Sequence, residues 1–369
     1  MKAGIITFHR ALNYGALLQA YGLKETLQFV GYDVFVIDYR NKILEKMYEY
    51  PVFIKQRGLK NKVRYIFYSK NERKKRANFE LFRNRYLALT DTAYTTNKAL
   101  SVLNGVFDLF FTGSDQVWSP DAHDVDEAFF LGFVEDSSKK RSYAASFGVV
   151  EIRDELSAKY RQLLSDFEIC SIREPEGVAI ISKISPEKEI RQDIDPVFLV
   201  AKEKWVNDFV LKKTKKAYAL IYSFSMDEYQ KSMAIECCKQ GLDVVIIGEA
   251  VKNPYNFPCL FAGDAGPVEF LQLLYGASFI ITNSFHGAAM SLVLNRRFTL
   301  RMLDGGAAKA NSRLTNLVKI FGLEDCVLNQ DADCQRLFNQ SFDWNHINLI
   351  IKEEKRKSVE YIEKCGEKI

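Results

Sequence analysis

The hydrophobic pattern at the start of the chain predicts a strand, a helix and a second strand. Residues 3–8 form a short apolar run, residues 14–30 carry apolar side chains three and four positions apart, and residues 33–38 form another apolar run. Short runs are typical of buried strands, and the middle spacing is typical of an amphipathic helix. Parallel strands need a crossover connection of this kind. The pattern therefore predicts a βαβ unit in a parallel sheet.

The loop after the first predicted strand is a candidate ligand site. In open α/β sheets, ligands bind beyond the carboxyl ends of the strands, beside helix N-termini. His9, Arg10 and Asn13 lie in this loop, and Gly15 lies at the start of the helix. The other interpretation is that Asn13 only caps the helix.

The alternation of strands and helices continues along the chain. Further strands are predicted at residues 106–111, 141–147, 168–172, 217–224, 242–247, 279–281 and 297–300. Further helices are predicted at residues 152–167, 202–213, 226–240, 267–275, 312–321 and 345–365. The expected fold class is therefore α/β, with two Rossmann-like doubly wound domains facing a cleft.

A Pro-interrupted stretch at residues 193–198 is a candidate linker between the two domains. We expect an N-terminal domain at residues 1–190 and a C-terminal domain at residues 191–342. Residues 343–369 are expected to form a helix that packs back on the first domain.

Residues 42–90 are rich in lysine and arginine and predict a pair of helices inserted in the first domain. In one interpretation, the basic side chains form a solvated face while an apolar stripe packs on the sheet. In the other, the basic surface, including residues 73–76, contacts an anionic membrane or a phosphorylated lipid-linked acceptor. The apolar stripe consists of Val63, Ile66, Phe67, Phe79 and Phe82.

Small polar residues follow the predicted strands at 106–111 and 141–147. Trp118, within the sequence TGSDQVWSP, can either stack on a sugar ring or lie in the core. Asp115 can either take a proton from a sugar hydroxyl or cap its own loop. The candidate ligand contacts in these two turns are Ser114, Asp115, Trp118 and Ser146.

The main candidate for catalysis lies within residues 279–292, FIITNSFHGAAMSL. An apolar run ends there in a polar turn, and a helix begins with glycine and alanine. Asn283, Ser284 and Gly287 lie in this strand-to-helix turn, and His286 projects from it. An imidazole can deliver a proton to a substrate bound at a helix N-terminus. A core histidine bonded to backbone is the other interpretation.

The composition is that of a globular protein, with 369 residues, 47% hydrophobic and 27% charged. A net charge of +4 does not indicate nucleic-acid binding. The seven cysteines form no CxxC pair, and no metal site is expected. Neither a signal-peptide core nor an apolar stretch of about 20 residues is visible. We therefore expect a cytoplasmic protein, with peripheral contact at the inner face of the membrane if the basic segment binds lipid.

Six stretches of the chain, in order, resemble the bacterial polysaccharide pyruvyl transferase family. They are FHRALNYGALLQAYGL, FTGSDQVWSP, YAASFG, SIRE, DPVFL and TNSFHGAAMSLVLNRRF. The resemblance implies two Rossmann-like domains similar to glycosyltransferases of the B type. It also implies transfer of the pyruvyl group of phosphoenolpyruvate to a sugar diol as a cyclic ketal, without a cofactor. The acceptor implied is a sugar or a lipid-linked glycan.

The same resemblance implies that His286 is the catalytic acid and that Arg173 contacts phosphoenolpyruvate. One position departs from the pattern, because Ser284 stands where better-known members have an arginine. Phosphate and carboxylate groups in a dry site need charge-assisted donors. The candidates to supply them are Arg10, Arg173, Lys309 and Arg313.

Two other functions stay open at this point. A glycosyltransferase of the same fold would use a nucleotide sugar as donor. A non-catalytic glycan-binding relative would keep the fold without the donor site. Ketal formation from an enol phosphate needs a proton donor at the vinyl carbon and donors for the leaving phosphate. A histidine and helix N-termini suit those two needs.

Overall fold

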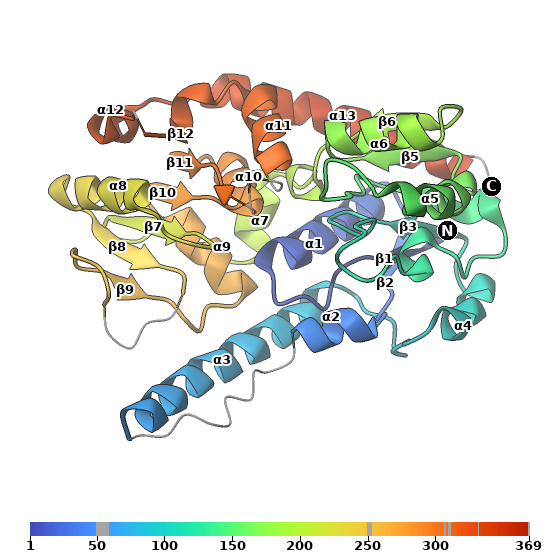
Figure 1. Cartoon of the computed structure of the whole chain (residues 1–369), viewed down its shortest axis with the longest axis horizontal. Helices are drawn as coiled ribbons and strands as arrows, with labels where there is room; N and C mark the ends of the chain where they lie inside the picture. Colours follow the sequence, from blue (N-terminus) through green and yellow to red (C-terminus); the bar gives the residue numbers. More distant parts are fainter. Residues whose placement is uncertain (49–58, 249–252, 306–307, 309–310, 331, 368–369) are drawn as a thin grey trace.

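The computed structural model has two α/β domains, with helix α3 running below them and helix α13 above them in Figure 1. It describes residues 1–48, 59–248, 253–305, 308, 311–330 and 332–367, without the side chains of residues 59–69.

The first domain contains parallel strands in the order β2-β1-β3-β4, followed by the parallel pair β5-β6. The strands are β1 (Lys2–Ile6), β2 (Asp33–Val36), β3 (Leu109–Thr112), β4 (Lys140–Ser142), β5 (Ile169–Ile172) and β6 (Glu189–Gln192). Ala145, just after β4, forms a parallel bridge with Ile172 of β5, and Ser171 N donates to Ser142 Oγ at 2.8 Å. The pair β5-β6 therefore lies beside β4. The predicted βαβ unit is confirmed, since β1 pairs parallel with β2 across α1.

The second domain has a six-stranded sheet in the order β12-β11-β10-β7-β8-β9. The strands are β7 (Tyr218–Tyr222), β8 (Asp243–Ile246), β9 (Leu260–Phe261), β10 (Phe279–Thr282), β11 (Phe298–Arg301) and β12 (Val327–Leu328). Read from β9, this is the 3-2-1-4-5-6 order of Rossmann domains. The order reverses between β7 and β10, which is where such sheets bind ligands.

The predicted helices are present with shifted ends, and the short helices α4 and α12 were not predicted. In the first domain the helices are α1 (Tyr14–Phe29), α2 (Lys42–Met47), α3 (Leu59–Tyr86), α4 (Asn97–Leu100), α5 (Asp154–Ser165) and α6 (Pro175–Ile184). Beyond it they are α7 (Lys202–Asp208), α8 (Glu228–Lys239), α9 (Pro267–Gly276), α10 (Phe285–Val293), α11 (Asn311–Phe321), α12 (Cys334–Asn339) and α13 (Trp344–Glu367). The apolar run that forms α6 had no predicted element.

Helix α1 lies between the two domains and is buried almost all round. Gly15 and Gly22 lie two turns apart on one of its faces. A methyl group on Gly15 would come 1.9 Å from His286 Nδ1, and one on Gly22 would come 2.5 Å from the Pro196 carbonyl oxygen. The two glycines therefore let α10 and the short 3-10 helix η4 (Pro196–Phe198) approach the α1 backbone closely.

Helix α3 packs on helices from both halves of the chain. The Phe79 ring lies 5.2 Å from Tyr14 of α1, and Phe82 stacks on Phe209 at 5.7 Å. We expected the stripe to pack on the sheet, but these two rings have their aromatic partners in α1 and at the end of α7. The other members of the predicted stripe, Val63, Ile66 and Phe67, lie outside the residues whose side chains are described.

Several polar side chains of α3 also hold it in place. Lys74 Nζ lies 2.5 Å from Asp264 Oδ2, and Asn78 donates to the Asp264 carbonyl oxygen at 3.1 Å. Arg76 donates to the Tyr48 carbonyl oxygen at 2.6 Å. Part of the basic segment therefore makes contacts within the protein, and its contact with an anionic membrane stays a prediction. None of the described helices combines the length and apolar character needed to cross a bilayer.

The C-terminal helix α13 contacts the first domain. Tyr361 donates to the Ser142 carbonyl oxygen at 3.1 Å, and Arg141 donates to the Cys365 carbonyl oxygen at 3.0 Å. In Figure 1, α13 begins beside the second domain and ends near the N-terminus. The domain boundaries at residues 190 and 342 stay predictions.

We expect Phe82→Ala to lower the free energy of unfolding by about 3–5 kcal/mol, because it removes a fully buried ring that stacks on Phe209. Leu81→Ala is the control on the same helix, since Leu81 is 60% exposed; its effect should stay within about 0.5 kcal/mol. Urea unfolding followed by circular dichroism measures both variants. Equal losses would show that the aromatic contacts of α3 do not stabilise the protein.

Candidate active site

Five titratable side chains meet between the two domains. Asp115 follows β3, and Arg173 directly follows β5. Asp195 precedes η4, His286 lies in the first turn of α10, and Arg313 lies in α11. All five come from strand ends, helix starts or the segment that joins the domains, so the fold gathers residues that are far apart in sequence.

The local sequence holds His286 at the start of α10. Ser284 caps this helix, and its Oγ accepts a hydrogen bond from Gly287 N at 3.4 Å. A methyl group on Gly287 would lie 2.3 Å from Thr282 Oγ1, so the first turn packs tightly on the end of β10. The His286 ring, only 6% exposed, lies against Gly15 of α1. The histidine is therefore held between the two domains.

The buried carboxylate of Asp195 lies at the centre of the cluster. Its Oδ2 lies 2.6 Å from Arg173 Nη1 and 3.4 Å from His286 Nε2. Its Oδ1 accepts a hydrogen bond from Val197 N at 3.1 Å. Burial alone would raise the pKa of Asp195, but the attraction of His286 and Arg173 outweighs it and lowers the pKa well below its ordinary value. Asp195 is therefore a carboxylate that links groups from both domains.

Two arginines share contacts with Asp115 and Phe285. Asp115 Oδ1 lies 3.5 Å from Arg173 Nη2 and 3.9 Å from Arg313 Nη1. The guanidinium carbon of Arg173 lies 5.1 Å from the Phe285 ring centroid, and that of Arg313 lies 5.9 Å from it. Burial and the neighbouring Arg173 lower the pKa of Arg313. Burial also disfavours the charged Arg173, but the carboxylates of Asp195 and Asp115 outweigh it and raise that pKa. Neighbouring carboxylates therefore offset the positive charge of Arg313 less than that of Arg173.

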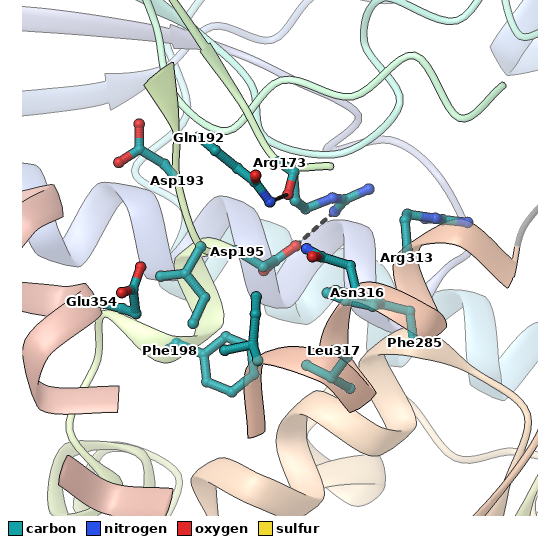
Figure 2. Close-up of a pocket in the computed structure, with 12 residues that line it drawn as sticks. Arg173, Gln192, Asp193, Asp195, Phe198, Phe285, Arg313, Asn316, Leu317 and Glu354 are labelled. Atoms are coloured by element: carbon teal, nitrogen blue, oxygen red, sulfur yellow. Dashed lines mark hydrogen bonds and ion pairs between the residues drawn. The ribbon is translucent and has the colours of Figure 1, made fainter. Parts of the chain in front are cut away.

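A cavity of about 260 Å³, which we call the arginine cavity, lies beside this cluster. Figure 2 shows Arg173 and Arg313 at one end of it, with Asp195 and Asn316 beside them. Several buried donors here have no hydrogen-bond partner within the protein. They are Arg173 Nε and Nη2, Arg313 Nε, His286 Nε2 and Ser146 Oγ. Leaving such groups unpaired costs about 1–3 kcal/mol each, so a ligand rich in acceptor oxygens would satisfy them.

The cluster is not simply basic, because Glu174 adds a third carboxylate. Glu174 Oε1 accepts hydrogen bonds from Phe147 N and Gly148 N, and its Oε2 lies 3.7 Å from Arg173 Nε. Two arginines therefore face three carboxylates, and the formal charge of the group is negative unless His286 is protonated. A protonated imidazole would make the group neutral before any ligand binds.

The predicted contacts in the first loop are not part of this cluster. His9 is fully buried, and its Nε2 lies 3.1 Å from Asp38 Oδ1. Arg10 pairs with Glu45 at 2.9 Å and with Glu80 at 3.6 Å. The contribution of Arg10 to the donor site stays a prediction, and in this structure α2 and α3 provide its carboxylate partners.

Asn13 and Gly15 have structural contacts at the start of α1. Asn13 caps the helix by accepting hydrogen bonds from Gly15 N at 2.9 Å and Ala16 N at 3.4 Å. The space above Gly15 is filled by His286, so the predicted contact of Gly15 with substrate is replaced by contact with the histidine.

The prediction that Trp118 offers its face to a sugar is wrong. Its side chain is fully buried, stacks on Phe130 at 5.5 Å and donates to the Phe129 carbonyl oxygen at 3.1 Å. Ser114 is likewise buried, and its hydroxyl donates to the Ala144 carbonyl oxygen at 2.7 Å. Of the candidates in this loop, Asp115 alone reaches the arginines among the described contacts.

Some of the remaining predicted contact residues have structural roles, and for others the predicted role stays open. Asn283 accepts a hydrogen bond from Phe224 N at 2.9 Å and donates to the Ser225 carbonyl oxygen at 3.1 Å, which ties β10 to the loop after β7. Ser284 and Gly287 shape the turn that carries His286. Ser146 stays a candidate ligand contact because its hydroxyl is unpartnered. Lys309 lies outside the described residues.

Asp195, Glu174 and Asn316 were missed by the sequence reasoning. Asp195 lies in the Pro-interrupted stretch that was interpreted as a linker, although DPVFL is one of the stretches that carry the resemblance. Asn316 lies three residues after Arg313, and that helical spacing places both on one face of α11. Across the described part of the chain, no three His, Cys, Asp or Glu residues are gathered in a way that could hold a metal ion.

Two Rossmann-like domains with a charged cluster at their junction define an α/β protein of the glycosyltransferase B type. The UDP-GlcNAc 2-epimerase of Methanocaldococcus jannaschii resembles this chain with a TM-score of 0.52 and 10% identity, over 97% of this chain and 98% of that one. The ADP-heptose LPS heptosyltransferase II of E. coli has a TM-score of 0.37 and 12% identity, over 96% and 99% of the two chains. At these identities the epimerase shows the fold alone.

The sequence model of the polysaccharide pyruvyl transferase family matches residues 13–300, which is most of the chain. The chain belongs to this family. Membership indicates a transferase that acts on polysaccharide. No protein among those with curated functions matches the chain.

We expect Gly15→Ala to displace the His286 ring, because the added methyl group would lie 1.9 Å from Nδ1. Long-range ¹H–¹⁵N NMR of the imidazoles measures this, since the chain has only four histidines. The His286 signals should shift while those of exposed His346 stay unchanged. Gly105→Ala is the control, because nothing lies within 4 Å of its added methyl group. Unchanged His286 signals in Gly15→Ala would contradict the close approach of α10 to α1.

We expect Asp195→Asn to lower the free energy of unfolding by about 3–5 kcal/mol near neutral pH, because Arg173 then lacks its closest carboxylate. The lowered pKa of Asp195 means that its stabilisation is present above the unfolded-state pKa and is lost as the pH falls through the folded-state value. The difference in the free energy of unfolding between wild type and Asp195→Asn should therefore become smaller below about pH 4. Urea unfolding at several pH values measures it.

Asp154→Asn is the control for that experiment. Asp154 is exposed and pairs only at 3.8 Å with Lys183, so its loss should cost less than about 1 kcal/mol. A gap for Asp195→Asn that is equally small, or that widens as the pH falls, would contradict the assignment of a buried ionised carboxylate.

Proposed function

We propose that the protein transfers the pyruvyl group of phosphoenolpyruvate to two hydroxyls of a sugar in a polysaccharide or glycan precursor. The product is a cyclic ketal, and inorganic phosphate is released. The observation that carries the proposal is the pair of arginines, Arg173 and Arg313, that line the arginine cavity with buried donors free of hydrogen bonds, next to His286, in a chain of this family. Phosphoenolpyruvate brings a phosphate and a carboxylate, which are acceptors of the kind that guanidinium groups bind.

In this proposal, the two arginines bind the donor. Arg313 is the less compensated cation, and its free Nε donor suits a phosphate or carboxylate oxygen. Arg173 is held by Asp195 through Nη1. Its Nη2 and Nε atoms lie 3.5 Å from Asp115 and 3.7 Å from Glu174 without a hydrogen bond to either, so they can donate to a ligand. Ser284 replaces the arginine of better-known members and caps α10 instead. Arg313, from another helix, would supply part of the missing charge.

His286 is the proposed proton donor. Protonated His286 gives its proton to the vinyl methylene carbon of phosphoenolpyruvate, and positive charge develops at the carbon that carries the phosphate. The first sugar hydroxyl adds to that carbon and gives its proton back to the imidazole. General acid catalysis of this kind contributes about 10²–10⁴-fold. The protonated imidazole also makes the local charge neutral, which favours binding of an anionic donor.

The second hydroxyl completes the ketal. The bond from carbon to phosphate oxygen breaks, the second hydroxyl adds to the same carbon, and its proton leaves with the phosphate. One hydroxyl proton therefore ends in the new methyl group and the other on the released phosphate. No oxidant or reductant is consumed.

Two carboxylates have supporting roles in this mechanism. Asp195 lies 3.4 Å from His286 Nε2, where it orients the ring. Asp115 was predicted as a base, but its carboxylate lies between two arginines, 3.5 Å from Arg173 Nη2 and 3.9 Å from Arg313 Nη1. We therefore assign Asp115 to positioning the two guanidinium groups. The acceptor sugar, a lipid-linked form of it and a cytoplasmic location stay predictions.

We expect phosphoenolpyruvate to raise the melting temperature of the protein, because it satisfies buried donors only in the folded state. Thermal-shift measurements with phosphoenolpyruvate, UDP, GDP and inorganic phosphate test this. Arg313→Ala should weaken the phosphoenolpyruvate shift. Stabilisation by UDP or GDP with none by phosphoenolpyruvate would favour a nucleotide-sugar glycosyltransferase and reject the proposed donor.

We expect His286→Asn to reduce phosphate release by about 10²–10⁴-fold, because the proton donor is lost. Release from phosphoenolpyruvate is measured colorimetrically with a panel of methyl glycosides as acceptors. His346→Asn, on the exposed start of α13, is the matched control and should retain full turnover. Retained turnover in His286→Asn would remove this residue from the catalytic role.

A further inference from the structure

A second cavity, which we call the aromatic cavity, lies between the two domains and has a volume of about 300 Å³. It is bounded by the start of α1, by one face of α3 and by the carboxyl ends of β7, β8 and β9. None of the residues of the arginine cavity lines it. A volume near 300 Å³ is at the lower end of small-molecule sites and suits a ligand of monosaccharide size.

The aromatic cavity adjoins the turn that carries His286. Tyr14 lines it and directly precedes Gly15, which contacts the His286 ring. Tyr222 lines it too, and a methyl group on Gly287 would lie 3.0 Å from the Tyr222 ring. The arginine cavity meets the same turn through Phe285. The first turn of α10 therefore lies between the two cavities.

The chemistry of the aromatic cavity differs from that of the arginine cavity. Its charged lining residues are one acid and one base, Glu72 and Lys75, so it has no excess of positive charge for an anion. Asn13 adds an amide group. Phe224 lines it with 66% of its surface exposed, so a ligand can reach the ring, which lies 6.3 Å from Tyr222. Aromatic faces beside hydrogen-bonding groups of both kinds suit a neutral sugar ring.

We propose that the aromatic cavity binds the acceptor as an uncharged pyranose ring, with the apolar face of the sugar on Phe224. Lys75 and Asn13 donate to its hydroxyl oxygens, and the Glu72 carboxylate accepts from a hydroxyl. The inference rests on the proposed function for the role of acceptor. The site lies beside the turn that carries the proposed proton donor, on the side away from the arginine cavity.

Saturation-transfer difference NMR with uncharged methyl glycosides tests this site in the full chain. The probes are methyl β-glucopyranoside, methyl β-galactopyranoside, methyl α-mannopyranoside and methyl N-acetyl-β-glucosaminide. We expect at least one of them to bind, and Phe224→Ala to weaken it by about tenfold through loss of the aromatic contact. Phe29→Ala is the matched control, since Phe29 is 74% exposed at the far end of α1, and it should leave binding unchanged.

The outcomes separate this inference from the proposed function. Binding of a glycoside that Phe224→Ala and Lys75→Ala weaken, with an unchanged phosphoenolpyruvate shift, supports the acceptor site. Absence of binding by every glycoside, equal binding by Phe224→Ala and wild type, or displacement of the glycoside by UDP overturns it. Glycoside binding at Phe224 without any phosphoenolpyruvate-induced change in melting temperature would support the sugar site but reject phosphoenolpyruvate as the donor.

Discussion

The junction of the two domains depends on one buried carboxylate, that of Asp195. It pairs with Arg173 at the end of β5 and approaches His286 at the start of α10, so each domain supplies one of its partners. The segment that carries it enters η4, which packs against the α1 backbone at Gly22. An uncompensated buried charge is costly. The Asp195 carboxylate therefore constrains two things together: how the two domains are placed and where the proposed proton donor lies.

The same cluster keeps polar atoms that a stability argument alone would not retain. Arg173 and Arg313 hold unpartnered buried donors beside the arginine cavity, and Glu174 adds an unpartnered acceptor oxygen. Proteins depart from complete hydrogen bonding chiefly at functional sites. These buried donors at the domain junction are the basis for proposing that an oxygen-rich ligand binds there.

The close approach of α10 and η4 to the α1 backbone determines which groups lie at the domain junction. Gly15 and Gly22 remove side chains from one face of α1, so the His286 ring and η4 occupy that space. The first turn of α10 is thereby fixed between the arginine cavity and the aromatic cavity. Two cavities of different chemistry, one charged and one neutral, therefore lie beside the turn that carries His286. The charged cavity carries the proposed donor site, and the neutral cavity carries the proposed sugar site.

Hydrophobic periodicity alone determined the βαβ start, the α/β class and most helices, because burial repeats with the local geometry of each element. His286 and Arg173 were found because each lies in a motif at the end of a strand. Tertiary structure alone decided that Trp118 is core, that Arg10 is paired with Glu45, and that Asp195 is central. A polar or aromatic residue looks the same in sequence whether it is free or paired, since its partner comes from packing of distant segments.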